Sequence, residues 1–262
     1  MFFAQNIMKE PTCSLWEINS ECWTNIKTKT VSDIVTQFRF KPDGTKFYTT
    51  EGHFKTTIKE YSLSTAWDIS TASYTQTHDF GGSDYVAGFD FNDNGTLIFI
   101  IRWKYDGTNQ YSNVYKHSLS SAWDVSTISS SSSQSKRLEG DYAQDLRISS
   151  DGTRLYSIVN NDLKIYQHNL STGFDLSTLS YANKSIDNPT GGRGIYLKPD
   201  GYKIYSAEIV QYDLSNSYEL DSASIAASEA YEYNYVVEFK SDGSMFFVAG
   251  LNDSTIYQYE LL

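Results

Sequence analysis

Basic residues are scarce in this chain. It has 21 Lys and Arg against 32 Asp and Glu in 262 residues, a formal net charge of −11. Nucleic-acid binding depends on clustered Lys and Arg side chains that contact phosphates, so this charge balance argues against that class of function. We therefore expect no nucleic-acid partner.

Long apolar runs and cysteines are also rare. No stretch of 18 apolar residues occurs, so we expect no membrane insertion. The first ten residues lack a basic region followed by an apolar core, so we expect no secretory signal and synthesis in the cytoplasm. The two cysteines, Cys13 and Cys22, could pair with each other, but they form no disulfide framework, and we expect free thiols.

A nine-residue motif returns along the chain and indicates a repeat protein. It reads Leu63-Ser-Thr-Ala-Trp-Asp-Ile-Ser-Thr71, and a near copy runs from Leu119 to Thr127. Looser copies span Leu170 to Thr178, with Phe174 in place of Trp, and Leu214 to Ser222, with Tyr218. Motifs that recur at intervals of a few tens of residues are typical of solenoids and propellers.

A second motif fixes the register of the repeats. Short stretches of apolar/polar alternation, such as Phe38-Arg-Phe40, lead into an Asp-Gly or Asn-Gly pair five times, with the glycines at Gly44, Gly95, Gly152, Gly201 and Gly243. Alternation with period two predicts β-strands, and glycine after Asp or Asn favours a tight hairpin turn. Five units of antiparallel strands follow, so the chain is predicted to be all-β.

The two ends of the chain complement each other within this pattern. Trp16-Glu-Ile-Asn19 copies the end of the nine-residue motif, whereas Ile256 to Leu262 copies the segment that precedes it and then stops. We predict a single five-bladed β-propeller over residues 16–262, with four-stranded antiparallel blades and a last blade closed by the N-terminal strand near residues 18 to 28. Residues 1–15 are predicted to form an N-terminal arm that docks on a partner or neighbouring subunit through Phe2, Phe3, Ile7 and Met8, with a disordered or self-packed end as the alternative.

Aromatic residues recur at two fixed positions of the repeat. One position holds Trp16, Trp67, Trp123, Phe174 and Tyr218, which we expect to pack between neighbouring blades because every unit carries one. The other position holds His117 and His168 where the remaining units have tyrosine. These histidines are therefore interpreted as aromatic strand residues and not as metal ligands.

The two motifs together resemble a repeat found in virion proteins of marine tailed bacteriophages. The resemblance lies in Gly192-Arg-Gly-Ile-Tyr196 followed by Lys198-Pro-Asp-Gly201, and in the link from Tyr61 to Thr71. It extends over roughly residues 16–262, although Ala66 stands where such links usually have proline. The resemblance implies a structural or tail-associated role in a virion, with other virion proteins as partners and several copies per particle. It transfers no catalytic site.

One column of acidic residues offers a candidate site. Asp33, Asp84, Asp141 and Glu232 stand eleven residues before the turn glycines, with Thr190 at the remaining position, and Tyr85, Tyr142 and Tyr233 directly follow three of them. We expect these residues around one mouth of the central channel. The carboxylates could cap loops, form a ring that binds a cation, or act as the acid and base of a glycosidase, and the tyrosines could contact a sugar or a protein.

The function expected from these observations is non-enzymatic. The sequence has no phosphate-binding glycine loop, nucleophile elbow or zinc-protease motif, and we expect no catalytic residue, no metal and no cofactor. We expect a virion protein, tail-associated as a fibre, adaptor or receptor-binding module, that contacts other virion proteins and a host surface glycan or receptor. The alternatives are a capsid decoration protein and a glycan-active propeller, either glycosidase or lectin.

Overall fold

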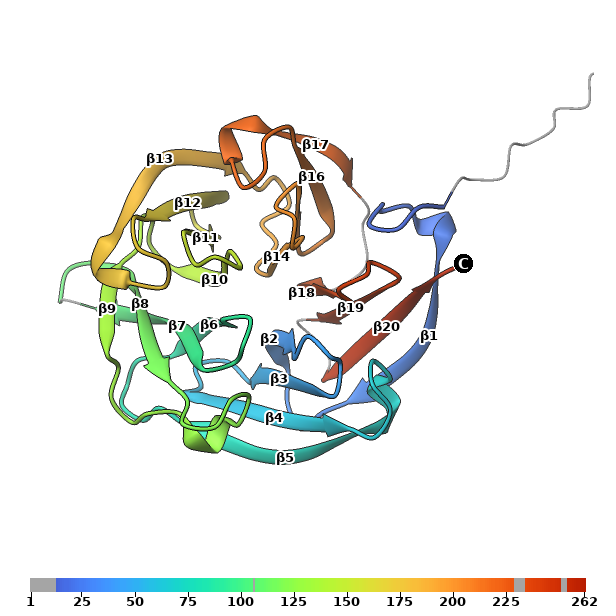
Figure 1. Ribbon diagram of the computed structural model, residues 1–262, viewed down its shortest axis with the longest axis horizontal. Helices are drawn as coiled ribbons and strands as arrows, with labels where there is room; N and C mark the ends of the chain where they lie inside the picture. The colour runs from blue at the N-terminus through green and yellow to red at the C-terminus, as the bar shows by residue number, and fades with distance from the viewer. Residues whose placement is uncertain (1–12, 106, 229–233, 251–253) are drawn as a thin grey trace, which may run out of the picture.

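The computed structural model arranges the chain as five four-stranded antiparallel sheets around a central axis (Figure 1). It describes residues 13–105, 107–228, 234–250 and 254–262. In four sheets the strands are paired in sequence order from the axis to the rim. In the fifth sheet, three strands from the end of the chain follow the same order, and the first strand of the chain lies outermost. The five-bladed propeller predicted from the repeats is confirmed.

The blades are numbered in the order in which their inner strands occur. Blade 1 contains β2 (Val35–Phe40), β3 (Lys46–Glu51), β4 (Thr57–Leu63) and β5 (Ala72–Asp79). Blade 2 contains β6 (Val86–Phe91), β7 (Leu97–Tyr105), β8 (Gln110–Ser118) and β9 (Gln134–Arg137). Blade 3 contains β10 (Ala143–Ile148), β11 (Arg154–Val159), β12 (Lys164–Leu170) and β13 (Leu179–Asp187).

The remaining two blades meet where the chain closes. Blade 4 contains β14 (Ile195–Leu197), β15 (Lys203–Ser206), β16 (Val210–Leu214) and β17 (Ala223–Ser228). Blade 5 contains β18 (Asn234–Phe239), β19 (Met245–Gly250), β20 (Thr255–Leu261) and, as its outer strand, β1 (Trp23–Thr30). Short 3₁₀ helices precede the outer strands: η1 (Ser20–Cys22), η2 (Ile69–Thr71), η3 (Val125–Thr127), η4 (Leu176–Thr178) and η5 (Leu220–Ser222).

The first and last described strands pair with each other and complete the ring. β1 runs antiparallel to β20, with Trp23 opposite Leu261 and Thr30 opposite Thr255. The Leu262 amide adds a bond of 2.9 Å to the Cys22 carbonyl. Closure by the N-terminal strand is thus confirmed, although the strand begins at Trp23 and not near residue 18, because Ser20–Cys22 form η1.

The hydrophobic core is divided among the blade interfaces. Five clusters of buried apolar residues can be distinguished in the described part of the chain, and each is drawn from two neighbouring blades. The recurring aromatic of the link lies at these interfaces: Trp123 packs 5.1 Å from Phe91 of its own blade and 6.3 Å from Tyr48 of the preceding one, measured between ring centroids. The predicted packing of this column between blades is confirmed.

The repeated glycine and the repeated aromatic require each other. Gly95 adopts a φ of +69°, which non-glycine residues rarely take, and a Cβ atom there would lie 2.3 Å from the Trp123 ring. Equivalent pairs join Trp67 to Gly44, Phe174 to Gly152, Tyr218 to Gly201 and Trp16 to Gly243. The aromatic ring lies flat on the turn because no side chain separates them.

Hydrogen bonds across each interface also follow the repeat. The first backbone N–H of a 3₁₀ helix donates to a side-chain oxygen of the preceding blade: Ile69 to Gln258, Val125 to Glu60, Leu176 to Gln134 and Leu220 to Gln167, all within 3.2 Å. Ile18, ahead of η1, donates to Gln211 in the same way at 3.0 Å. We call these five bonds the interblade latches. They satisfy buried N–H groups that would otherwise lack partners.

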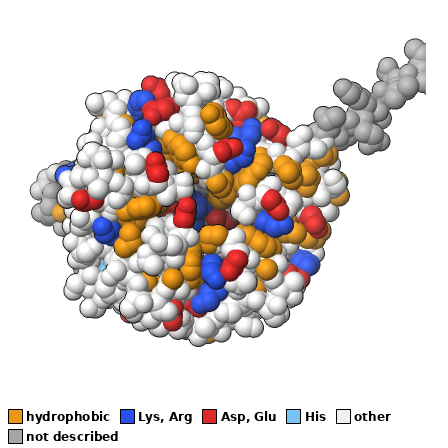
Figure 2. All heavy atoms as spheres, viewed as in Figure 1, with side chains coloured by type: hydrophobic (Ala, Val, Ile, Leu, Met, Phe, Trp, Pro, Cys, Tyr) orange, Lys and Arg blue, Asp and Glu red, His pale blue; other side chains and the backbone are white. Residues whose placement is uncertain are grey.

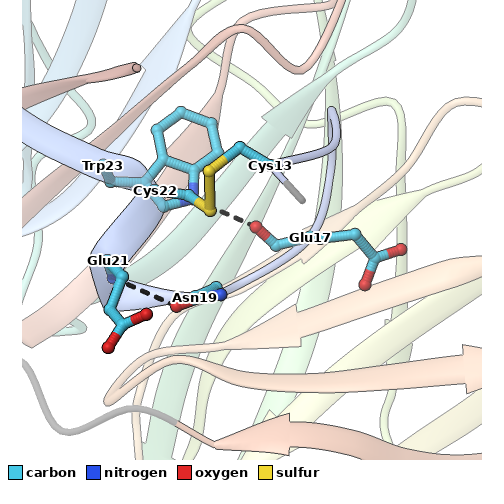
Figure 3. The surroundings of a disulfide bond; sticks show 6 residues. All are labelled: Cys13, Glu17, Asn19, Glu21, Cys22 and Trp23. Carbon is cyan, nitrogen blue, oxygen red and sulfur yellow. Dashed lines mark hydrogen bonds between the residues drawn. A yellow bond between two sulfur atoms is a disulfide. The ribbon is translucent and has the colours of Figure 1, made fainter. Parts of the chain in front are cut away.

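The two cysteines are disulfide-bonded, so the expectation of free thiols was wrong. The chain turns back between them, which brings their Cα atoms to 5.3 Å. Figure 3 shows the bond beside Trp23, whose indole N–H donates to the Glu17 carbonyl at 3.0 Å. From the spacing of nine residues alone, the sequence could not show whether the chain between the cysteines brings the two thiols together.

His168 is an aromatic strand residue, as interpreted from its column, and it predicts acid sensitivity. It is buried on β12, its Nε2 accepts the Glu139 backbone N–H at 3.0 Å, and burial lowers its pKa to about 4. Such a histidine contributes stability above about pH 6.5, the pKa of the residue in an unfolded chain. This contribution is lost as the pH falls from there through the lower pKa that the residue has in the folded chain. We expect the free energy of unfolding to fall by on the order of 3 kcal/mol from this residue between pH 7 and pH 4.

Urea titrations at pH 7, 5 and 4 would measure this dependence. His168→Phe keeps an aromatic ring in the column and should show a shallower fall in unfolding free energy over the same interval. A smaller slope should remain from His117, because burial also lowers the pKa of that residue. Equal slopes for the parent and the variant would contradict the assignment.

Candidate functional site

The propeller has two faces, which carry different segments of the repeat. The Asp-Gly turns and the 3₁₀ helices lie on one, which we call the turn face. The segments that lead into the inner strands lie on the other, which we call the loop face. Figure 2 shows the central hollow of one face, with basic and acidic side chains inside it.

Charged side chains fill the middle of the ring. The position five residues before each turn glycine lies between two buried apolar residues of an inner strand, and it holds Arg39, Asp90, Arg147, Tyr196 and Glu238. All five are buried, as is Asp145 on β10. We call the two arginines with Asp90, Asp145 and Glu238 the central network.

The strongest contacts of the central network cross the axis. Arg39 of blade 1 donates to Asp145 of blade 3 at 2.5 Å, and Arg147 of blade 3 donates to Glu238 of blade 5. Asp90 of blade 2 lies 3.7 Å and 3.6 Å from the two guanidinium groups. Because these pairs join blades that are not neighbours in the ring, the network ties the whole ring together.

Backbone groups complete the bonding of the carboxylates. Asp145 accepts the Ile195 N–H and Asp90 accepts the Ile148 N–H, each at 3.0 Å. Burial raises the pKa of Asp90 and of Glu238, whereas the facing arginines oppose that rise. For Arg147 burial works against the charged form, but the surrounding carboxylates outweigh it and raise the pKa. Arg147 is therefore held in its charged form, whereas the pKa of Asp90 and of Glu238 remains above the ordinary carboxyl value.

The central network was not anticipated from the sequence. The signal was present as a polar residue between apolar neighbours in each inner strand, as in Phe38-Arg39-Phe40. Such alternation is usually interpreted as one buried and one solvated face. In a propeller both faces of a blade are covered by neighbours, so the polar set is buried as well.

A cavity opens on each side of the network, and the two share no lining residue. The one on the turn face has a volume of about 350 Å³, has central-network residues at its base and includes Trp67, Trp123 and Tyr218 of the link motif in its lining. The one on the loop face has a volume of about 310 Å³. We call the second the loop-face cavity.

The loop-face cavity is built by four blades. Its aromatic lining comes from Phe54 of blade 1, Tyr85 and Trp103 of blade 2, and Tyr142 of blade 3. Its polar lining comes from Thr36, His53, Gln144, Asn160, Asn161 and Arg193. Two of the tyrosines selected from the sequence, Tyr85 and Tyr142, line this cavity.

The aromatic residues of this cavity form two pairs across blade boundaries. The Phe54 and Tyr85 rings lie 4.8 Å apart, and the Trp103 and Tyr142 rings lie 5.5 Å apart in an edge-to-face arrangement. The Trp103 indole N–H donates to the Ala143 carbonyl at 2.8 Å. Both Phe54 and Tyr142 have a φ of +60°, a conformation that non-glycine residues seldom adopt.

The described members of the acidic column each contact a nearby backbone or basic group. Asp33 accepts the neighbouring Ile34 N–H at 2.8 Å, Asp84 pairs with Lys104, and Asp141 lies 3.5 Å from Arg137 in an exposed pair. Each side chain is engaged within its own part of the rim, and none lines the loop-face cavity. The loops that carry these three carboxylates hold them against nearby basic or backbone groups, and the three interpretations of the column stay predictions.

Other selected residues lie outside the described residues. These are Glu232 and Tyr233 of the acidic and tyrosine columns, and Phe2, Phe3, Ile7 and Met8 of the N-terminal arm. Within the described ranges, no group of three or more His, Cys, Asp or Glu side chains could hold a metal ion. No helix of those ranges has the length and apolar content that a membrane span requires.

Comparisons with known proteins return a likeness of shape only. No family model matches the chain, and no curated protein matches it. Among solved structures, it is similar to the β-propeller domain of Cps50 (Swd1) from Myceliophteria thermophila, with 12% identity and a TM-score of 0.49 over 90% of this chain and 100% of that one. We draw no functional conclusion from that likeness, and the five-bladed architecture rests on the strand pairing described above.

Proposed function

We propose that this protein is a non-enzymatic virion component, associated with the tail as a fibre, adaptor or receptor-binding module, that uses its propeller as a rigid binding scaffold. The observation that carries the binding role is the loop-face cavity, to which three blades contribute aromatic or amide side chains and a fourth contributes Arg193. Concave sites with apolar walls and a few polar groups are typical of ligand binding. The virion role is supported by the resemblance of the repeats to those of phage virion proteins.

The arrangement of the carboxylates supports binding over hydrolysis. A glycosidase needs two carboxyl groups on either side of a substrate, in different environments. Asp33, Asp84 and Asp141 are each engaged in a local contact, and the carboxylates of the central network bond to arginine and backbone N–H groups. A glycosidase therefore has no support from the described residues, and the proposal does not include one.

Attachment to the particle is proposed to use residues 1–15, with several copies per virion. Phe2, Phe3, Ile7 and Met8 are apolar and would gain stability from burial against a partner. A capsid decoration protein would share the same scaffold and the same arm, and it differs from a tail protein only in where the arm binds.

Mass spectrometry of purified particles tests this proposal. Particles banded in a density gradient should contain the protein at a constant ratio to the major structural proteins across the gradient. Labelling with a specific antibody in electron micrographs would then separate tail from capsid. Absence of the protein from washed particles would overturn the virion role, and labelling confined to the capsid shell would replace the tail assignment with decoration.

A further inference from the structure

We propose that the cavity on the turn face binds an aliphatic diamine, with one ammonium group against the central network and the other at the mouth of the cavity. This inference goes beyond the proposed virion role and does not use the loop-face cavity. Three features carry it: an excess of negative charge at the base of the cavity, a belt of apolar side chains above the base, and one carboxylate at the mouth.

This cavity, which we call the turn-face cavity, has three layers to which every blade contributes one residue. The layers hold the residues five, four and two positions before the turn glycine of each blade, and all five turns lie within the described residues. The base is formed by Arg39, Asp90, Arg147, Tyr196 and Glu238, the belt by Phe40, Phe91, Ile148, Leu197 and Phe239, and the mouth by Pro42, Asp93, Ser150, Pro199 and Ser241.

The base carries more negative than positive charge. The central network consists of two guanidinium groups and three carboxylates, all buried, so one negative charge is in excess when every group is ionised. A buried charge without a partner of opposite sign is costly. Burial accordingly raises the pKa of Asp90 and of Glu238. A cation bound at the base would balance the excess charge.

Asp90 is a network carboxylate that an incoming cation can reach. Its side chain is 11% exposed, whereas that of Asp145 is fully buried and does not line the cavity. Asp90 Oδ1 accepts its own neighbour's backbone N–H at 3.0 Å. Arg39 Nε and Arg147 Nη1 lie 3.7 Å and 3.6 Å from this oxygen, and neither is close enough for a hydrogen bond. An ammonium group can therefore bond to Asp90 Oδ1 without displacing a guanidinium.

The wall between base and mouth is apolar and aromatic. The belt residues are buried, and three rings of the link motif, those of Trp67, Trp123 and Tyr218, are partly buried and also line the cavity. Methylene groups gain stability when such a wall removes them from water. Ammonium groups are attracted to the faces of Trp and Tyr rings. The wall thus suits an alkyl chain that carries positive charge.

Asp93 brings a carboxylate to the mouth. Burial raises its pKa, and among the described residues no cation acts to lower it. In blade 2 the turn reads Asn92-Asp93-Asn94, whereas three other turns have lysine in place of Asn92 and aspartate in place of Asn94. Those lysines are already engaged, with N–O distances of 2.7–2.8 Å in the pairs Lys41–Asp43, Lys198–Asp200 and Lys240–Asp242.

Two negative positions separated by an apolar belt match the charge pattern of an aliphatic diamine. One ammonium would balance the base, the methylene groups would lie along the belt, and the second ammonium would pair with Asp93. A monoamine would leave Asp93 without a partner, and an inorganic cation would leave the belt unfilled. A volume of about 350 Å³ lies within the range of small-molecule sites.

Titration of the full chain at pH 7 and constant ionic strength tests the inference, since both amino groups of the probe are then charged. The probe is 1,5-diaminopentane, and its counterparts of equal chain length are pentylamine, pentanol and glutarate. Chemical shifts of the indole N–H groups report where the probe binds. Those of Trp67 and Trp123 should move, whereas that of Trp103 in the loop-face cavity should not. We expect the diamine to bind at least about tenfold more tightly than pentanol, and glutarate not to bind.

Two variants assign the two ammonium groups. Asp93→Asn should weaken the diamine about threefold to fivefold and leave pentylamine unchanged, because only the diamine reaches the mouth. Asp90→Asn removes the excess charge of the base and should weaken both amines, and its thermal midpoint shows whether it is folded. Asp187→Asn is the matched control, because Asp187 is an exposed carboxylate outside the cavity, and it should bind the diamine like the parent.

Three outcomes would overturn the inference. They are equal binding of the diamine and pentanol, binding of glutarate as tight as that of the diamine, and a diamine affinity that Asp93→Asn leaves unchanged. The last outcome decides even if Asp90→Asn fails to fold, because Asp93 lies at the mouth and is exposed. None of these results depends on whether the protein is found in purified particles, so the inference and the virion role can fail separately.

Discussion

Replacing Arg39 with leucine is expected to destabilise the folded chain by about 3–5 kcal/mol. The change leaves Asp145 fully buried without its cationic partner, because the Arg39 guanidinium lies 2.5 Å from that carboxylate. Removing one member of a buried ion pair costs far more than the pair itself contributes, since the remaining charge stays desolvated. Equilibrium unfolding in guanidinium chloride, followed by tryptophan fluorescence, measures the loss.

Two further variants distinguish a lost charge from a lost side-chain volume. Asp145→Asn in the Arg39→Leu background removes the unpaired charge and leaves an amide oxygen to accept the Ile195 N–H, so it should restore part of the lost stability. Lys27→Leu is the comparison, because it removes an ion pair near the surface, in which the Lys27 Nζ lies 2.6 Å from the Asp68 carboxylate. It should change the free energy of unfolding by no more than about 1 kcal/mol. If Arg39→Leu proved as mild as Lys27→Leu, the central network would not hold the ring.

Deleting Thr255–Leu262 is expected to abolish the native state. The deletion removes β20, which pairs with both β19 and β1, and it removes Ile256, a fully buried member of the core cluster between blades 5 and 1. The ring would then be open, with unpaired strand edges on β19 and β1. We expect the free energy of unfolding to fall by as much as the whole net stability of a domain, typically about 5–15 kcal/mol. Size-exclusion chromatography should then show aggregates, and thermal unfolding should show no cooperative transition.

A circular permutant separates closure of the ring from the order of the chain. In it, residue 262 is joined to residue 13 by a flexible Gly/Ser linker, and new ends are opened between Ser131 and Ser132, which are exposed. Every strand pairing is retained, so this chain should unfold cooperatively with a midpoint close to that of the parent. Collapse of the permutant to the same aggregated state as the deletion would show that chain order, and not the pairing of β1 with β20, determines folding.

The architecture could be predicted because each element that defines it is repeated. A turn glycine such as Gly44 and a link aromatic such as Trp67 occur once per unit, and their contact requires the same geometry in all five blades. The ends of the chain completed each other's pattern, which located the closing pair β1 and β20. Repetition therefore made local signals sufficient for a long-range prediction.

The site was harder to predict because it depends on differences between the repeats. The central network uses a different residue in nearly every blade at one position, so Arg39 and Glu238 are not recognisable as one column by similarity. Conversely, Asp33, Asp84 and Asp141 share a column but bond to different neighbours. The loop-face cavity combines residues from loops of unequal length, and of its aromatic members only Tyr85 and Tyr142 followed the repeat.

The ion pairs across the axis lie between the cavities on the two faces of the propeller. Arg39 and Arg147 are buried in the middle of the ring and pair there with Asp145 and Glu238. Buried salt bridges therefore lie between an occupant of one cavity and an occupant of the other. Each entrance is accordingly expected to bind its own ligand with an affinity that does not change when the opposite entrance is filled.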